Sequence, residues 1–519
     1  MEQRSRKIQY LVTLCLSLAF LALGALSSWP TPVLQKFELS ETQVKINDAG
    51  ISWLVAMTPV GFIVGSFVTR YTSDRMGRRA TILASAPVQA VGSIIAVFAV
   101  EGWVLGIGVV FWNCSTGMLS TVIGIYFAEI AEKDLRATLA LYTRCAFSLG
   151  NVLVIAIGPL ITYKALNYAL LPLPFLYGAA CWWIPETPYY LLKEGKANKA
   201  RTELNRLRGY RNQKCLDEEL ETIQASVKCE MSRSSTAREL FFGQQYRRAV
   251  IVSAGIKFTQ IMTGGVAIKQ YLGVIMMEGG LSKDQTRWGF VAFGIITAVA
   301  SMVGSFLVDR MGRRPLLITS YLGTGLSLVT VGIYLFLLNN LHIEALFNFT
   351  FIPIVAIILS NVISTFGYGA LSAVIPAEIF PLNVKAIAMT SLNIFGGVLG
   401  FLCGKGYQDM KNLFHLHGVF WIYGSVALIG AVFAYFVIPE TGGKSLDEIQ
   451  KELQGGTNDD AGQKLDEVVL DRKGIVDDVP GKYNIINDVG IVNGANEEYG
   501  INNSESTEVD GLTKKVELP

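Results

Sequence analysis

The sequence predicts an all-α membrane protein whose twelve transmembrane helices form two pseudo-symmetric six-helix bundles. Hydrophobic residues make up 51% of the 519-residue chain and charged residues only 17%, whereas soluble proteins carry about a quarter charged residues. The mean hydropathy is +0.40, and apolar residues collect in twelve long runs. Motifs of the first half recur in the second half. These observations argue against an ordinary soluble enzyme and against a disordered chain.

Each apolar run has about the length of a membrane-spanning helix, which needs roughly 20 apolar residues. The first run follows Arg4, Arg6 and Lys7, as a signal peptide would, but its length and its continuation into Trp29 predict an uncleaved span. The expected spans lie near residues 8–28, 51–69, 80–100, 104–126, 137–161, 166–184, 249–277, 290–308, 315–338, 351–375, 387–403 and 419–438.

Lysine and arginine are distributed unevenly between the two sets of connections. Basic residues gather before the first span, around residues 70–79, in 185–248 and around 310–314. The positive-inside rule therefore predicts that both termini are cytosolic, and an even number of spans agrees. We expect an integral protein of the plasma membrane whose partners are the lipid bilayer and a small solute. The net charge of +2 gives no support for nucleic-acid binding, and we expect a monomer.

The predicted organisation has four parts. These are an N-terminal bundle (1–184), cytosolic linker helices (185–248), a C-terminal bundle (249–438) and a cytosolic tail (439–519). The linker contains amphipathic patterns around 197–208 and 216–228. From Lys451 onward the tail has fifteen acidic and seven basic residues, and we expect disorder after about residue 450. The acidic tail offsets a basic remainder, so the small net charge is a cancellation.

Three motifs recur in one order at nearly one spacing. Residues 74–79, Asp-Arg-Met-Gly-Arg-Arg, recur unchanged at 309–314, an offset of 235. Ala-Glu-Ile recurs at 128 and 377, and Pro-Glu-Thr at 185 and 439. Each hexapeptide falls between the second and third expected span of its half. The repeats therefore indicate two homologous halves of six spans.

On these motifs the chain resembles the sugar-porter family of the major facilitator superfamily. The resemblance covers about residues 8–450 and includes the insect facilitated trehalose-transporter branch and the facilitative glucose transporters. It rests on the segments 65–79, 126–136, 185–188, 304–314, 378–381 and 439–446. It implies the major facilitator fold and alternating access, in which a central site opens to one side at a time.

The resemblance also implies that the charged motifs face the cytosol and form a gating salt-bridge network. Arg78 and Arg79 could approach Glu129, and Arg313 and Arg314 could approach Glu378. Pairs between the bundles would form when the cytosolic side shuts and break when it opens. The simpler alternative is that these charges only satisfy the positive-inside rule and cap helices. That alternative explains the arginines but not the embedded Glu129 and Glu378. The full predicted network is Asp74, Arg75, Arg78, Arg79, Glu129, Arg136, Glu186, Asp309, Arg310, Arg313, Arg314, Glu378, Lys385 and Glu440.

The expected substrate site departs from the family pattern. The seventh span retains the first Gln, the Thr and the Gly of the family motif, but Ile261 and Val266 replace its second Gln and its Asn. The family Pro and Trp of the tenth span are also absent. Most polar sugar ligands are therefore missing, although the gating motifs remain. The residues that we expect at the site are Gln260, Thr263, Gly264, Lys269, Tyr271, Arg144 and Gly396.

Two cations stand out inside the apolar runs. Buried cations are costly in membranes and mark functional sites, so Arg144 and Lys269 raise the possibility of an anionic solute. Snorkelling or pairing near a helix end is the alternative, and it applies best to Arg144. Proton-coupled relatives carry an Asp after a Gly in the first span, whereas here Ala25 follows Gly24. We therefore expect a uniporter.

The leading hypothesis is a facilitative sugar carrier for a trehalose- or hexose-type solute. The alternatives are a carrier of another small polar or anionic solute, and a sugar sensor that does not transport. Seven cysteines and three histidines form no metal-ligand or catalytic pattern, so we expect no metal, no cofactor and no enzyme activity. Asn348 begins a possible glycosylation sequon close to the membrane.

Overall fold

The computed structural model describes residues 7–209, 213–232, 240, 243–341, 349, 351–380 and 382–440. Within these ranges the side chains of residues 133, 134, 136, 137, 226, 229–232, 244, 245, 305–310, 382, 383 and 386 are not described. The sequon at Asn348 and the tail after residue 440 lie outside the described residues. The described chain is helical, apart from an isolated bridge between Lys45 and Glu101.

Ten helical stretches among the described residues are long and apolar enough to cross a membrane, and they cover eleven of the twelve expected runs, since the stretch at 387–437 contains two of them. The run at 166–184 is interrupted near Pro172 and forms two short helices. The last two runs lie in a single helical stretch, Leu382–Val437, which is interrupted by a kink at His415, where φ is 56°. The all-helical membrane fold with two six-helix halves is therefore confirmed.

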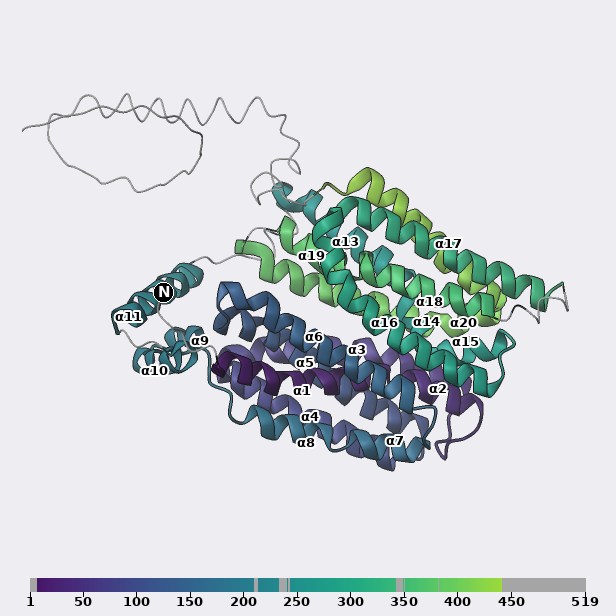
Figure 1. Cartoon of the computed structure of the whole chain (residues 1–519), viewed down its shortest axis with the longest axis horizontal. Coiled ribbons are helices and arrows are strands. Elements are labelled where there is room, and N and C mark those ends of the chain that lie inside the picture. The colour runs from purple at the N-terminus through teal and green to yellow at the C-terminus, as the bar shows by residue number, and fades with distance from the viewer. Residues whose placement is uncertain are drawn as a thin grey trace, which may run out of the picture. The chain divides into compact units, whose positions relative to one another are not determined.

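The first half contains eight helices, which Figure 1 shows in purple to blue. They are α1 (Lys7–Ser28), α2 (Pro30–Glu38), α3 (Asp48–Met76), α4 (Arg78–Phe98), α5 (Gly102–Ile130), α6 (Lys133–Ile157), α7 (Tyr163–Leu170) and α8 (Leu173–Cys181). Glycines permit very close crossings here. A Cβ at Gly24 would lie 2.0 Å from the backbone oxygen of Phe147, and one at Gly65 would lie 2.0 Å from that of Cys114. Small residues thus let α1 approach α6 and α3 approach α5.

The second half also contains eight helices, drawn from teal to yellow in Figure 1. They are α13 (Gln244–Met262), α14 (Gly265–Gln270), α15 (Leu272–Glu278), α16 (Lys283–Met311), α17 (Arg313–Asn339), α18 (Phe351–Phe366), α19 (Tyr368–Ile379) and α20 (Leu382–Val437). The expected seventh span breaks at Gly264, whose φ is 72°. The tenth breaks at Gly367, between α18 and α19. Discontinuous helices place backbone polar groups near the middle of a transporter.

The segment between the halves forms α9 (Pro188–Lys193), α10 (Ala197–Arg208) and α11 (Gln213–Ser232). These helices lie where amphipathic patterns were predicted. α10 buries Leu204 and Leu207. Arg208 donates to the backbone oxygen of Ile130 at 2.7 Å and pairs with Glu219 at 3.0 Å. The linker is therefore anchored to the first half.

The apolar core is divided unequally between the two ends of the helices. We call the end that carries residues 74–79 and 309–314 the basic end, and the end near Lys45 and Lys283 the opposite end. At the opposite end one cluster joins side chains of both halves, including Trp29, Trp112, Tyr271 and Phe290. At the basic end each half has its own cluster, one around Tyr126 and the other around Tyr321. The halves are thus joined by a common core at the opposite end.

Candidate functional site

The charged motif of the first half is built on the start of α4. Gly77 makes the turn with φ of 98°, and Arg78 then donates to Glu129 from Nη2 at 2.9 Å and from Nε at 3.2 Å. Thr187 donates to the other oxygen of Glu129 at 2.5 Å. This two-pronged contact holds the end of α5 against α4, because a guanidinium matches a planar carboxylate.

Glu186 completes this cluster from the beginning of the linker. Its carboxylate accepts the backbone N–H of Arg78 at 3.0 Å and that of Arg79 at 3.2 Å. It therefore caps the first turn of α4, where N–H groups lack partners and a negative charge is favourable. Burial raises the pKa of Glu186, and the backbone donors oppose that rise.

The second half repeats this construction with the corresponding residues. Gly312 has φ of 81°, Arg313 contacts Glu378 at 3.3 Å, and Glu440 accepts the backbone N–H groups of Arg313 and Arg314 at 2.9 and 3.0 Å. The local geometry thus combines pairing with helix capping, whereas the gating role of these charges stays a prediction. The arginine contacts its embedded glutamate, and the later glutamate caps the helix.

The remaining predicted network residues contribute less to these clusters. Asp74 lies 3.7 Å from Arg78 and 3.1 Å from Lys193, Arg75 lies over the Tyr71 ring, and Lys385 is half-buried in the first turn of α20. The side chains of Arg136, Asp309 and Arg310 are outside the described residues. Among the described pairs, each basic-end contact lies within one half. Contacts between the halves were expected only when that end is shut.

Polar contacts between the halves lie instead at the opposite end. Lys283 at the start of α16 forms an ion pair with Glu41, and that ammonium lowers the pKa of the Glu41 carboxyl through its hydrogen bond. Ser52 donates to the backbone oxygen of Lys405 at 3.0 Å. Sequence reasoning missed these contacts because each residue is an ordinary polar residue near a loop, and no repeat marks it.

The predicted residues Gln260, Thr263 and Gly264 lie at the break in the seventh span, between α13 and α14. Thr263 donates to the backbone oxygen of Gln260 at 2.7 Å and lies 3.4 Å from the Tyr368 hydroxyl. Gly264 lies against the ring of Tyr423. The side-chain oxygen of Gln260 is buried without a hydrogen-bond partner. A solute hydroxyl could donate a hydrogen bond to this buried oxygen and so supply the missing partner.

A second group of unpaired polar atoms lies next to the break. The rings of Tyr271 and Tyr407 stack at 4.2 Å, and both hydroxyl oxygens are buried without a partner. The side-chain oxygen of Gln270 is in the same condition. Tyr271 was predicted, whereas Gln270 and Tyr407 were not among the predicted residues. Tyr407 follows the expected eleventh run, in a polar stretch of α20 that carries no motif.

Lys269 lies between the two halves. Its Nζ donates to the side-chain oxygen of Asn151 at 3.1 Å, and its backbone oxygen accepts from Thr31. Lys269 and Asn151 line a cavity of about 130 Å³ that also contains Ser148 and Thr297. Arg144 is exposed and precedes Ser148 by four residues, about one turn of α6. Lys269 therefore lines a cavity between the halves, and Arg144 lies toward the basic end.

Gly396, which was expected at the substrate site, packs against a lysine of the seventh span. A Cβ at Gly396 would lie 2.5 Å from Cε of Lys257 and 3.2 Å from Ile261. Glycine thus makes room for a third intramembrane cation, which the sequence reasoning missed. The signal was present, because Lys257 interrupts the same apolar run as Lys269.

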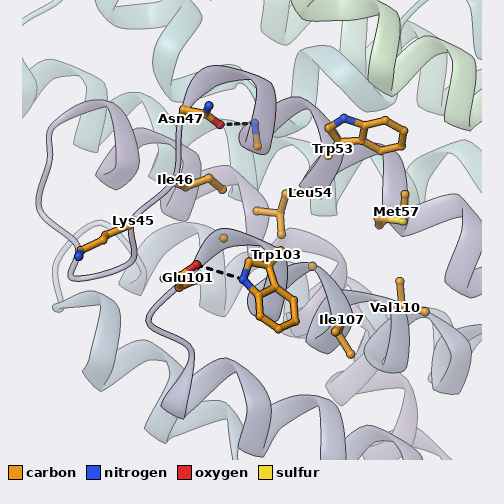
Figure 2. A pocket seen from close by; sticks show the side chains of 13 residues that line it. Lys45, Ile46, Asn47, Trp53, Leu54, Met57, Glu101, Trp103, Ile107 and Val110 are labelled. Atoms are coloured by element: carbon orange, nitrogen blue, oxygen red, sulfur yellow. Dashed lines mark hydrogen bonds between the residues drawn. The ribbon is translucent and has the colours of Figure 1, made fainter.

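A larger cavity, a groove of about 820 Å³, lies elsewhere, on α3 and α5 where these helices reach the opposite end. Figure 2 shows Trp53, Leu54 and Met57 on one side and Trp103 on the other, with the Trp103 indole donating to Glu101 at 3.0 Å. Trp53 and Trp103 are 48% and 67% exposed. The groove opens on the surface and contains none of the predicted substrate residues, so it is not a candidate solute site.

Two homologous helical halves, joined at one end and bearing polar groups between them, define a membrane carrier. The family profile described as "Sugar (and other) transporter" matches residues 21–453. The chain belongs to this transporter family. Among the described residues no three His, Cys, Asp or Glu side chains are grouped so that they could hold a metal ion.

Known relatives agree with this assignment. The chain is 26% identical over 455 residues to a facilitated trehalose transporter of Culex quinquefasciatus, covering 86% of each chain. It is 26% identical over 451 residues to one of Aedes aegypti and spans 55% of that protein's length. Among solved structures, it is similar to inward-open xylose transporter XylE from E. coli (TM-score 0.69, 16% identity, 85% and 99% coverage). XylE bound to 6-bromo-6-deoxy-D-glucose matches with a TM-score of 0.67, 18% identity, and 86% and 99% coverage.

Proposed function

We propose that this chain is a facilitative carrier of a polyhydroxylated solute of the sugar type. The observation that carries the proposal is the set of unpaired buried polar atoms on Gln260, Gln270, Tyr271 and Tyr407. An unpaired polar group costs about 1–3 kcal/mol, so such a set near a helix break is suited to the hydroxyls of a sugar. The family and the trehalose-transporting relatives support this substrate class.

Alternating access follows from the unequal division of the core. The common apolar cluster and the Glu41–Lys283 pair would separate when the opposite end opens. The basic ends would then approach each other and bring the clusters around Arg78 and Arg313 together. We propose that the basic end is cytosolic, with both termini on that side of the plasma membrane, because its arginines satisfy the positive-inside rule. The carrier works as a monomer in this proposal, since each chain supplies both halves.

We further propose uniport rather than proton coupling. A proton-coupled carrier needs a titratable group in its pathway, and the position after Gly24 is the buried Ala25. The described residues that line the cavity at Lys269 include no acidic side chain. Uptake should therefore be insensitive to a protonophore.

Uptake into proteoliposomes containing the purified full chain tests the proposal with a panel of labelled glucose, trehalose, polyols and organic acids. Saturable sugar uptake is expected. If no member of the panel is transported, the carrier function fails and the non-transporting sensor becomes the better interpretation.

Gln260→Leu should raise the KM for the transported sugar by about tenfold, because one hydrogen bond to the solute is lost. Gln89→Leu is the matched control, since Gln89 is also a buried glutamine of a span with an unpaired atom but contacts Ser115 inside the first half. An equal KM in the Gln260 variant and its control would contradict the assigned site.

A further inference from the structure

We propose that Lys269 binds the carboxylate of an acidic sugar, so that the carrier accepts uronate-type solutes in addition to, or in preference to, neutral sugars. This inference rests on the proposed function and specifies its substrate class. It comes from the cavity of about 130 Å³ between the halves, in which an ammonium faces neutral polar groups.

The charge of Lys269 is uncompensated in the described structure. Its Nζ donates to the neutral amide oxygen of Asn151 at 3.1 Å, and no described carboxylate lies within ion-pair distance. A cation in a membrane bundle normally faces a partner charge or a water-filled pathway, because transferring it to an apolar environment is costly. A solute anion would supply the missing charge.

The surroundings are arranged for an anion. The amide nitrogen of Asn151 donates to the backbone oxygen of Phe147 at 3.1 Å, which turns its oxygen toward Lys269 and the Ser28 hydroxyl. Hydroxyl groups of Ser148, Thr297, Ser301 and Thr365 also line this cavity. The Thr297 and Thr365 hydroxyls donate to Asn361, so Ser148 and Ser301 would supply the hydroxyl donors beside the ammonium, a combination that suits a carboxylate.

The sugar ring of such a solute would lie toward Gln260 and Tyr271. These side chains occupy the same discontinuous span as Lys269, and Gln260 and Tyr271 carry buried polar atoms without partners. One solute could therefore satisfy both conditions: its hydroxyls would meet the neutral polar groups, and its carboxylate would meet Lys269. Because the walls of the cavity come from both halves, binding there would also couple the solute to the relative movement of the halves.

Paired uptake of D-glucose and D-glucuronate tests this inference, because the two solutes differ only at the carbon that bears the carboxylate. In proteoliposomes the wild-type chain should take up glucuronate saturably. Uniport of a monoanion carries charge, so an interior-positive potential set with potassium and valinomycin should increase glucuronate accumulation and leave glucose unchanged.

Lys269→Gln should raise the KM for glucuronate by roughly 10- to 100-fold, the effect of losing one charge-assisted hydrogen bond, and should raise the KM for glucose by a smaller factor. Lys269→Arg should retain the preference. Lys411→Gln is the charge-matched control, because Lys411 pairs with Glu278 away from this cavity. Thermal stabilisation of the detergent-purified variant by glucose shows that it is folded.

The outcomes separate the two proposals. Uptake of glucose but not glucuronate by the wild type overturns the carboxylate inference and leaves the sugar-carrier proposal intact. An unchanged KM for glucuronate in Lys269→Gln also overturns it. Uptake of neither solute, nor of any sugar in the panel, by a folded wild type refutes the proposed function itself.

Discussion

Glu129→Gln offers the sharpest test of how the basic-end clusters hold each half together. Glu129 accepts from Arg78 at 2.9 and 3.2 Å and from Thr187 at 2.5 Å. The side chains of Arg78 and Glu129 are only 10% and 12% exposed. Replacing the carboxylate with a neutral amide leaves the buried guanidinium with only the more distant and exposed carboxylate of Asp74, at 3.7 Å.

The expected loss is about 3 kcal/mol of folding stability, the low end for breaking a buried pair. The equivalent change in the second half, Glu378→Gln, should cost about 1 kcal/mol. There the contact is longer, at 3.3 Å, and the side chains of Arg313 and Glu378 are 18% and 27% exposed. The sequence repeat alone would predict equal losses of stability in the two halves, whereas the lengths and burial of the two ion pairs predict unequal losses.

Both variants should reduce sugar uptake while protein still reaches the membrane, because each loosens a surface that must dock when the basic end shuts. The assay is denaturant unfolding of the detergent-purified full chain, with a double-mutant cycle that adds Arg78→Gln. A coupling energy below about 0.5 kcal/mol would refute the reasoning. So would equal destabilisation by the two Glu→Gln changes.

Three further predictions concern packing, pH and the opposite-end gate. Gly24→Ala should abolish stable expression, because the added Cβ would lie 2.0 Å from the backbone oxygen of Phe147. Gly106→Ala is the control, since a Cβ there meets no atom within 4 Å and the variant should express normally. Fluorescence size-exclusion chromatography measures both outcomes. Lys283 lowers the pKa of Glu41, so this ion pair stabilises the folded protein at neutral pH and that stabilisation is lost as the pH falls through the lowered pKa. Glu41→Gln should therefore remove this part of the acid dependence of the melting temperature. An unaltered dependence would show that other groups cause it. Tyr407→Phe removes an unpaired buried hydroxyl and should slow uptake while raising the melting temperature, because it favours the described state; faster uptake would contradict this.

The sequence predicted the number of spans, the two halves and the pairing at the charged motifs, because each depends on a local pattern. Apolar length predicts a span without tertiary information. The repeated hexapeptide placed Arg78 and Arg313 at equivalent turns, and the structure joins them to Glu129 and Glu378. Helix breaks were less visible: the sixth and seventh runs were treated as single spans, although Pro172 and Gly264 interrupt them.

The site could be predicted only in part, because contacts between halves depend on which conformation is adopted. Lys269 was recognised since a cation in an apolar run is conspicuous. Its partner Asn151 was not, because an isolated polar residue in a span has no periodic signal. Gly396 was expected at the solute site through a family correspondence, which stays a prediction, and the packing of Lys257 against it was not foreseen. A small residue opposite a large one can be recognised only when the two helices are seen together.

The buried hydroxyls of Tyr271 and Tyr407 also explain how a large apolar gate could open at all. Apolar burial at the opposite end favours closure, with Trp29, Trp112 and Phe290 contributing to one core across both halves. Each unpaired hydroxyl costs about 1–3 kcal/mol in the closed state and regains hydrogen bonds when water or a solute reaches it. Two such groups therefore offset part of the apolar gain and bring the two conformations closer in free energy. A carrier needs that near balance, because a gate stabilised by packing alone would remain closed whichever solute was bound.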